Sequence, residues 1–284
     1  MWLRINVLYR LILINIAVFL FINLFMLLGF LFNKPDISDI FLSFFSVPSS
    51  LQKLFFRFWT IFTYMFTHQD FWHLLGNMLW LYFLGSILLN VIEQKDFLIL
   101  YILGGLSGAL IFIIAFNIFP AFTVEKHFSI LLGASGSVTA IVIAVATLIP
   151  NENIYLFGIV RIKLFVIALF MLIYDFFLLK SSNAGGHFAH LGGAIYGFIF
   201  ALQLKKGNNI QNFAHTFWNN LFKTNRKIKI VKNNLKANND YDYNLNKNQI
   251  RQEIDRLLDK ISLHGYNSLN KKEREFLKKY SKFL

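Results

Sequence analysis

The 284-residue sequence contains no cysteine and only four prolines. The missing cysteines exclude disulfide bonds, thiolate-bound metals and a cysteine nucleophile. Charge is also scarce before Lys205, where 10 Lys and Arg residues accompany 8 Asp and Glu residues. Hydrophobic residues instead make up 56% of the chain, above the share of about 45–50% in soluble domains. The first 204 residues therefore have the composition of a polytopic membrane protein.

Six apolar segments have the length of about 20 residues that a helix needs to cross a bilayer. The first is too long for a signal-peptide core and lacks a small-residue cleavage site, so we expect a retained span. We therefore predict an all-α membrane domain over residues 1–204. The segments cover residues 8–32, 71–92, 97–119, 130–149, 159–179 and 187–204.

Basic residues indicate the orientation of this domain. Arg4 and Arg10 flank the start of the first segment, and Arg161 and Lys163 lie near the start of the fifth. From Lys205 onward, 18 Lys and Arg residues accompany 7 Asp and Glu residues. Because basic loops favour the cytoplasmic side, both termini are predicted to be cytoplasmic. Nucleic-acid binding is not expected, since the basic residues of the tail form no recognisable binding motif.

The tail divides into two parts. Residues 205–246 are rich in Asn and Lys and are predicted to form a linker, with a surface helix around residues 213–222. Residues 247–284 predict a small cytosolic helical hairpin, in which Gly265 ends one helix and Asn270 with Glu273 forms a capping box for the next. We expect this hairpin to pack against the membrane domain, another copy of the chain or a cytosolic partner.

Three of the apolar segments begin with polar residues that share one depth. With both termini cytoplasmic, the second, fourth and sixth segments all start at the outer face. They place His73, Asn77, Ser135 and His190 within about 10 Å of that boundary. Polar groups inside spans are costly and tend to face the protein interior or a water-filled cavity. The shared depth therefore indicates a functional site.

The residue types in this layer suit acyl transfer. Ser135 requires a neighbouring base to become a nucleophile, and His190 is the candidate, because histidine is the residue type best suited to act as a base near neutral pH. An oxyanion requires donors, which His73, Asn77 and the backbone N–H groups at a helix start supply. No carboxylate accompanies these residues, so the pattern predicts a Ser–His dyad. Small residues beside both candidates favour close packing of the two helices; they are Gly133, Gly136, Gly193 and Gly197.

Other interpretations of the same residues stay open. Serine and glycine in membrane helices most often serve packing, and an intramembrane histidine can belong to the proton path of a small transporter. His187 shares a helix face with His190 and is a competing base. Ser137 is a weaker nucleophile, because it points about 200° around the helix from Ser135. Asp175 near the end of the fifth segment is assigned a structural role.

Residues 8–204 resemble the rhomboid family of intramembrane serine proteases. Two positions depart from the family pattern: Thr60 follows Trp59 where the family carries an arginine, and Thr139 stands where some members have a tyrosine that stacks on the histidine. The resemblance is carried by the order of the segments and by three motifs: Gly133-Ala134-Ser135-Gly136, His190 with Gly193 and Gly197, and His73-Leu74-Leu75-Gly76-Asn77.

The resemblance implies a rhomboid-like bundle of six transmembrane helices and an intramembrane serine endopeptidase without metal or cofactor. It assigns Ser135 as nucleophile, His190 as general base and acid, and His73 with Asn77 as oxyanion-hole donors. The implied substrates are transmembrane or juxtamembrane segments of other proteins in the bilayer of the bacterial inner membrane. A non-catalytic rhomboid-like protein that binds membrane proteins, or a small polytopic transporter, is the alternative.

Overall fold

The computed structural model describes residues 6–34, 36–156, 160–207 and 253–280. The chain divides into two units, residues 1–223 and 224–284, and each is described by itself. The helices of the first unit are α1 (Val7–Leu31), α2 (Asp36–Phe45), α3 (Leu51–Phe56), α4 (Thr60–Thr63), α5 (Phe71–Leu88), α6 (Gln94–Ile118), α7 (Ser135–Leu148), α8 (Leu164–Phe177) and α9 (Ala184–Lys205).

Short elements connect these helices. The 3-10 turns are η2 (Tyr64–Phe66), η3 (Pro120–Phe122), η4 (Glu125–His127) and η5 (Leu178–Lys180). Two antiparallel ribbons pair β1 (Val47–Pro48) with β2 (Ile130–Leu131) and β3 (Asn153–Leu156) with β4 (Val160–Lys163).

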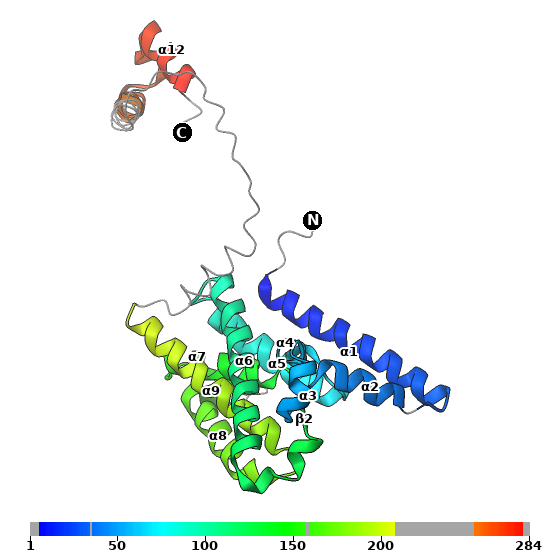
Figure 1. Cartoon of the computed structure of the whole chain (residues 1–284). Coiled ribbons are helices and arrows are strands. Elements are labelled where there is room, and N and C mark those ends of the chain that lie inside the picture. Colours follow the sequence, from blue (N-terminus) through cyan, green and yellow to red (C-terminus); the bar gives the residue numbers. More distant parts are fainter. Residues whose placement is uncertain (1–5, 35, 157–159, 208–252, 281–284) are drawn as a thin grey trace. The chain divides into compact units, whose positions relative to one another are not determined.

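Helix α7 lies among the other helices of the first unit, beside α6 and α9 (Figure 1). It contacts α5, α6, α8 and α9, and every residue from Gly136 to Ala146 is buried. A helix that is apolar on all sides lies either in a protein core or against lipid, and α7 is enclosed by the other helices. Its first residue, Ser135, is thereby held at the end of the most enclosed helix.

Glycines bring α9 against α7 at backbone distance. A Cβ atom added at Gly193 would collide with the carbonyl oxygen of Gly136, and one added at Gly197 would collide with that of Ala140. The two glycines lie one helical turn apart and therefore share a face. Small residues four apart let helices approach closely where lipid supplies no hydrophobic drive for association.

Each of the six apolar segments contains one helix, but two of the predicted boundaries are wrong. Helix α7 begins at Ser135 and not at residue 130, because Ile130 and Leu131 pair with β1 instead. Helix α8 begins at Leu164, because residues 160–163 pair with β3. A short apolar run suits a strand as well as a helix. The all-α expectation therefore holds for the bundle and fails at these two ribbons.

The helices differ in length. Within the described ranges, four are long and apolar enough to cross a membrane, namely α1, α5, α6 and α9. Helices α7 and α8 have 14 residues each, which corresponds to about 21 Å. Large apolar side chains are exposed on the long helices, including Leu20, Phe30 and Ile118. These features are those of an integral membrane protein, whose lipid-facing surface is apolar.

Side-chain hydrogen bonds anchor the loop between α2 and α5, in which Thr60 stands where the family resemblance implies an arginine. Three consecutive backbone carbonyls at residues 43–45 accept hydrogen bonds of 2.9–3.1 Å from the side chains of Arg57, Trp59 and Thr63. The buried Thr60 hydroxyl donates to the Arg57 carbonyl at 2.6 Å. The loop is therefore anchored by its neighbours in sequence, without a basic side chain at position 60.

In the second unit, residues 253–264 form a helix that ends at Gly265, whose φ of +74° suits glycine. The turn η6 (Tyr266–Ser268) leads into α12 (Lys271–Tyr280). Ile254, Leu257 and Leu269 are buried within this unit. The predicted surface helix at residues 213–222, and all but the first three residues of the predicted linker, lie outside the described residues.

Asn270 and Glu273 exchange hydrogen bonds at the start of α12. The Asn270 N–H donates to Glu273 Oε2 at 2.8 Å, and the Glu273 N–H donates to Asn270 Oδ1 at 2.9 Å. This reciprocal pair confirms the capping box. The Glu273 carboxylate also lies 2.9 Å from Lys260 Nζ on the preceding helix, so it links the two helices as well as capping one of them. The Asn270 backbone bond and Lys260 hold the pKa of Glu273 below its ordinary value.

Gly193→Ala should destabilise the membrane domain by about 1–3 kcal/mol, because the new methyl group overpacks a backbone contact. Gly76→Ala is the matched control, since a Cβ at Gly76 has no atom within 4 Å. The control should leave stability unchanged or raise it by up to about 1 kcal/mol through helix propensity. Denaturant titration in detergent micelles, followed by circular dichroism, measures both. Equal stability of the two variants would contradict the close contact.

Candidate functional site

The four predicted site residues lie at the starts of three helices. Ser135 is the first residue of α7, and His190 lies two turns into α9. His73 is in the first turn of α5 and Asn77 follows one turn later. The Asp70 carboxylate caps α5 by accepting the His73 N–H at 2.8 Å, which fixes the direction of the helix start. The polar residues are thus placed by helix ends and not by loops.

Ser135 and His190 are brought near each other by their neighbours in sequence. Gly136 follows Ser135, and a Cβ at Gly136 would lie 3.3 Å from the carbonyl oxygen of Ala189, which precedes His190. Both candidate side chains are half-buried. Within the described ranges, the Ser135 hydroxyl makes no hydrogen bond, to His190 or to any other group. Catalytic hydrogen bonds are often long before substrate binds.

Gly133 has a different place from the one predicted. It precedes α7 and does not lie within the helix, and its φ of +113° is in the left-handed region. A Cβ at this position would lie 2.7 Å from Cε1 of the His73 ring. Gly133 therefore lets the start of α7 approach the start of α5, and it places His73 beside the residues that precede Ser135.

Two loop residues that the sequence interpretation missed hold the turn before Ser135. The carbonyl of Tyr64 accepts the Gly133 N–H at 3.0 Å. Nε2 of His68 lies 3.3 Å from the Ala134 N–H and also 3.3 Å from Nδ2 of Asn77. Both partners are donors, so His68 is neutral and carries its hydrogen on Nδ1. A histidine five residues before His73 was a visible signal in the sequence.

Asn77 is fully engaged in this arrangement. Its Nδ2 group donates to the His73 carbonyl at 2.9 Å and contacts His68 at 3.3 Å. An amide has two hydrogens, so neither is left for another acceptor. For Asn77 to donate to an oxyanion, it must exchange one of these bonds, and the longer bond to His68 is the one more readily given up.

Ser137 and Thr139 are enclosed in α7. Ser137 is fully buried, and its Oγ lies 4.0 Å from Sδ of Met65. Thr139 is also buried. Ser137 therefore lacks the access that a nucleophile needs, whereas Ser135 is half-buried at the helix start. The first N–H groups of α7 have no acceptor within the helix, and they carry the positive end of the helix dipole beside Ser135.

The expectation that no carboxylate accompanies the site is wrong. Oδ1 of Asp175 on α8 lies 2.7 Å from Nδ1 of His190 and 2.7 Å from Nδ1 of His187. Asp175 is 3% exposed, and a carboxylate so deeply buried is costly unless it is paired. The sequence assigned Asp175 only a structural role, and the packing of α8 on α9 shows that it contacts His190 as well as His187.

Among the described residues, these three side chains are also of the types that bind metal ions, and they lie close together. One potential ligand atom from each of Asp175, His187 and His190 lies within 4.8 Å of the others. The two distances of 2.7 Å to the carboxylate are ordinary hydrogen-bond lengths. Hydrogen bonds therefore account for the observed arrangement.

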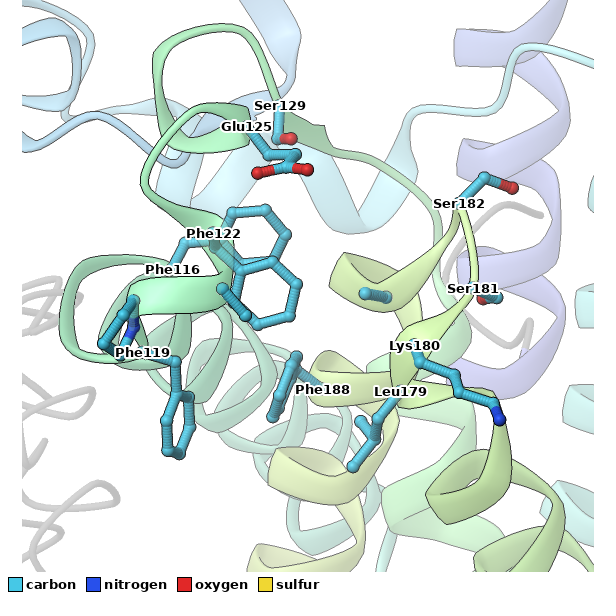
Figure 2. Close-up of a pocket in the computed structure, with 13 residues that line it drawn as sticks. Phe116, Phe119, Phe122, Glu125, Ser129, Leu179, Lys180, Ser181, Ser182 and Phe188 are labelled. Carbon is cyan, nitrogen blue, oxygen red and sulfur yellow. The ribbon is translucent and has the colours of Figure 1, made fainter.

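A cavity of about 620 Å³ lies at the ends of α6 and η5 and the start of α9 (Figure 2). Its wall is aromatic, with Phe116 stacked on Phe122 at a ring distance of 4.4 Å. Glu125 and Lys180 contribute the charged groups of the lining. None of the four predicted site residues lines this cavity. It is therefore not the space in which Ser135 would meet a substrate.

His68 should make stability depend on pH. Burial, with a smaller contribution from the charge of His73, lowers the pKa of His68 from 6.5 to about 4. The unfolded chain then takes up a proton before the folded chain does. The stability contributed by neutral His68 is fully present above about pH 6.5 and is lost as the pH falls toward about 4.

His68→Gln removes this proton-linked contribution. The thermal midpoint in detergent should therefore change less between about pH 7.5 and about pH 4.5 in this variant than in the wild-type protein. His127→Gln changes an exposed histidine in η4 and serves as the control, which should follow the wild type. An identical pH dependence in all three proteins would show that His68 is not held neutral by burial.

Comparison with known proteins identifies the family of the chain. A model of the rhomboid domain matches residues 56–207, and a family of unknown function (DUF6576) matches residues 238–283. RHOMBOID-like protein 12, mitochondrial, of Arabidopsis thaliana is 29% identical over 161 residues, which cover 53% of this chain and 48% of that protein. The chain thus matches about half the length of this relative. Because the rhomboid domain covers more than half of the chain, the protein is a membrane protein of the rhomboid family.

Proposed function

We propose that the protein is an intramembrane serine endopeptidase with Ser135 as nucleophile and His190 as general base and acid. One observation supports the proposal: Gly136 lies close to the carbonyl oxygen of Ala189, and the half-buried Ser135 and His190 are the sequence neighbours of these two residues. A serine hydroxyl needs such a neighbouring base to attack a carbonyl carbon. Membership in the rhomboid family supports the same reaction.

The proposed reaction proceeds in two stages. Ser135 Oγ attacks the peptide carbonyl while its proton passes to Nε2 of His190. The C–N bond then breaks, and His190 returns the proton to the leaving amine. Water attacks the resulting ester, gives its proton to His190 and releases the carboxyl product, while the proton returns to Ser135. No metal or cofactor is required.

The oxyanion of each tetrahedral intermediate needs donors. The N–H groups at the start of α7 point toward the space beside Ser135, and the helix dipole favours negative charge there. His73 and Asn77 add side-chain donors from α5. Asn77 would exchange its bond to His68 for one to the oxyanion, so this donor is made available only as charge develops.

The proposed topology has six spans with both termini cytoplasmic, in a bacterial inner membrane. Helix α7 is about 21 Å long, whereas the hydrocarbon core is about 30 Å thick. When Leu148 lies at one boundary, Ser135 lies well inside the other. The nucleophile is then within the membrane but reachable by water from one side.

The proposed substrates are transmembrane or juxtamembrane segments of other membrane proteins. The backbone of a substrate helix is already hydrogen-bonded, so the segment must unwind locally before Ser135 can attack. Small residues at the cleaved bond fit best, because Gly133, Ala134 and Gly136 surround Ser135 and leave space only near the backbone.

Labelling with a fluorophosphonate probe tests the nucleophile. Wild-type protein in detergent should be labelled, and Ser135→Ala should lose labelling and the cleavage of a reporter transmembrane segment. Ser137→Ala is the matched control, because it removes a buried hydroxyl two residues away and should keep both activities. Equal labelling of wild type and Ser135→Ala would refute the assignment. A non-catalytic rhomboid-like protein would show neither labelling nor cleavage.

For the tail, we propose a linker over residues 205–246 and a small cytosolic unit over residues 247–284 with a regulatory or oligomerisation role. The two helices of the described part are joined by Lys260 and Glu273, and the match to a recurrent family at residues 238–283 supports a defined module. Its partner would be another copy of the chain or a cytosolic protein.

Deletion of residues 247–284 should leave cleavage of the reporter segment within about threefold of the wild-type rate in detergent, because the proposed site lies wholly in the first unit. Size-exclusion chromatography with light scattering would show in parallel whether the deletion changes the oligomeric state. Loss of cleavage in a truncated protein with an unchanged thermal midpoint would instead make the tail part of the catalytic unit.

A further inference from the structure

The Asp175 carboxylate is buried in the first unit and has no part in the two stages of the proposed reaction. It lies on the buried face of α8, two turns after Ile167 and Ala168. Its Oδ1 meets His187 and His190, which are three residues apart on one face of α9. A charged residue inside a membrane domain is costly and indicates a functional role.

The hydrogen bonds define where the protons lie. A carboxylate oxygen only accepts hydrogen bonds, so Nδ1 of both histidines carries a hydrogen. A neutral imidazole has one N–H, and a histidine with its hydrogen on Nδ1 has a lone pair on Nε2. His190 is therefore held in the tautomer that can take a proton at Nε2, the nitrogen that the proposed reaction uses.

We propose that Asp175 is a positioning residue that holds His190 in this tautomer and orientation and stabilises the imidazolium formed when Ser135 loses its proton. The inference rests on the proposed function. It turns the predicted Ser135–His190 dyad into a three-residue array in which α7, α9 and α8 each supply one member. Asp175 remains ionised throughout and transfers no proton.

The unequal exposure of the two histidines assigns their roles. The His187 side chain is 9% exposed and that of His190 is 20% exposed. Both share the same carboxylate oxygen, but only His190 is adjacent to Ala189, whose carbonyl meets Gly136 beside Ser135. His187 is thus the second partner that fixes Asp175, and His190 is the one that Asp175 holds toward the nucleophile.

The test measures the inactivation of full-length protein by a fluorophosphonate, separated into a maximal rate and a half-saturating concentration. Asp175→Asn removes the negative charge. Because an amide can donate or accept a hydrogen bond, it also permits either tautomer of His190, so the maximal rate should fall by about 10²- to 10⁴-fold. The half-saturating concentration should stay within about twofold. A change confined to the half-saturating concentration would overturn the positioning role.

His187→Phe is the matched control for the contact between α8 and α9. It deletes one of the two hydrogen bonds to Asp175 and leaves the bond to His190 in place. Its loss of maximal rate should therefore be at least tenfold smaller than that of Asp175→Asn. Equal losses, with thermal midpoints lowered equally, would show that the carboxylate serves only to join the helices.

A measurement on the wild-type protein keeps the proposal testable even if Asp175→Asn does not fold. Nuclear magnetic resonance of ¹⁵N-histidine-labelled protein in micelles, assigned with His190→Gln, should show the His190 hydrogen on Nδ1. A hydrogen on Nε2 would overturn the inference. So would a change of this spectrum or of the inactivation rate on chelation, since a metal would then occupy the three side chains.

The outcomes separate this inference from the proposed function. If Ser135→Ala reacts as the wild type does, the protease assignment fails and the role of Asp175 fails with it. If Ser135→Ala is unreactive while Asp175→Asn reacts at the wild-type rate, the protease assignment stands and only the positioning role is lost.

Discussion

The backbone contact between α7 and α9 is the interaction on which the rest of the first unit depends. Gly193 and Gly197 let α9 lie directly on the carbonyls of Gly136 and Ala140. In lipid, helices gain little from burying apolar surface, so close van der Waals packing must hold them together. That packing also sets the separation of Ser135 and His190, and a displacement of about 1 Å is enough to impair chemistry of this kind.

A second constraint comes from the polar groups that surround this contact. Neutral His68 joins Asn77 to the residue before Ser135, and Asp175 joins His190 to α8. Buried polar groups are costly without partners, and here Nε2 of His68 and the carboxylate of Asp175 both lie within hydrogen-bond distance of groups from other parts of the chain. His68 thus holds the residue before Ser135, and Asp175 holds His190.

Much of the architecture was predictable because composition and periodicity act locally. The apolar segments, the basic tail and the capping box at Asn270 and Glu273 all follow from residue order. The ribbon at Ile130 and Leu131 was not predictable, because two apolar residues form a strand only when a partner strand lies beside them. Here the partner contains Val47, which is distant in sequence. The position of Gly133 was not predictable either, because it lies in the turn between this ribbon and α7, where its backbone is left-handed.

The sequence by itself determined which chemical groups are present and near which helix ends they lie, because these depend on residue type and spacing along one element. Only the tertiary structure decided which groups meet. Asp175 is 12 and 15 residues from the histidines it contacts, and no periodicity relates α8 to α9. The carboxylate became part of the candidate site because packing placed it there. Contacts between elements depend on the distance of approach, which the glycines permit but a linear pattern does not specify.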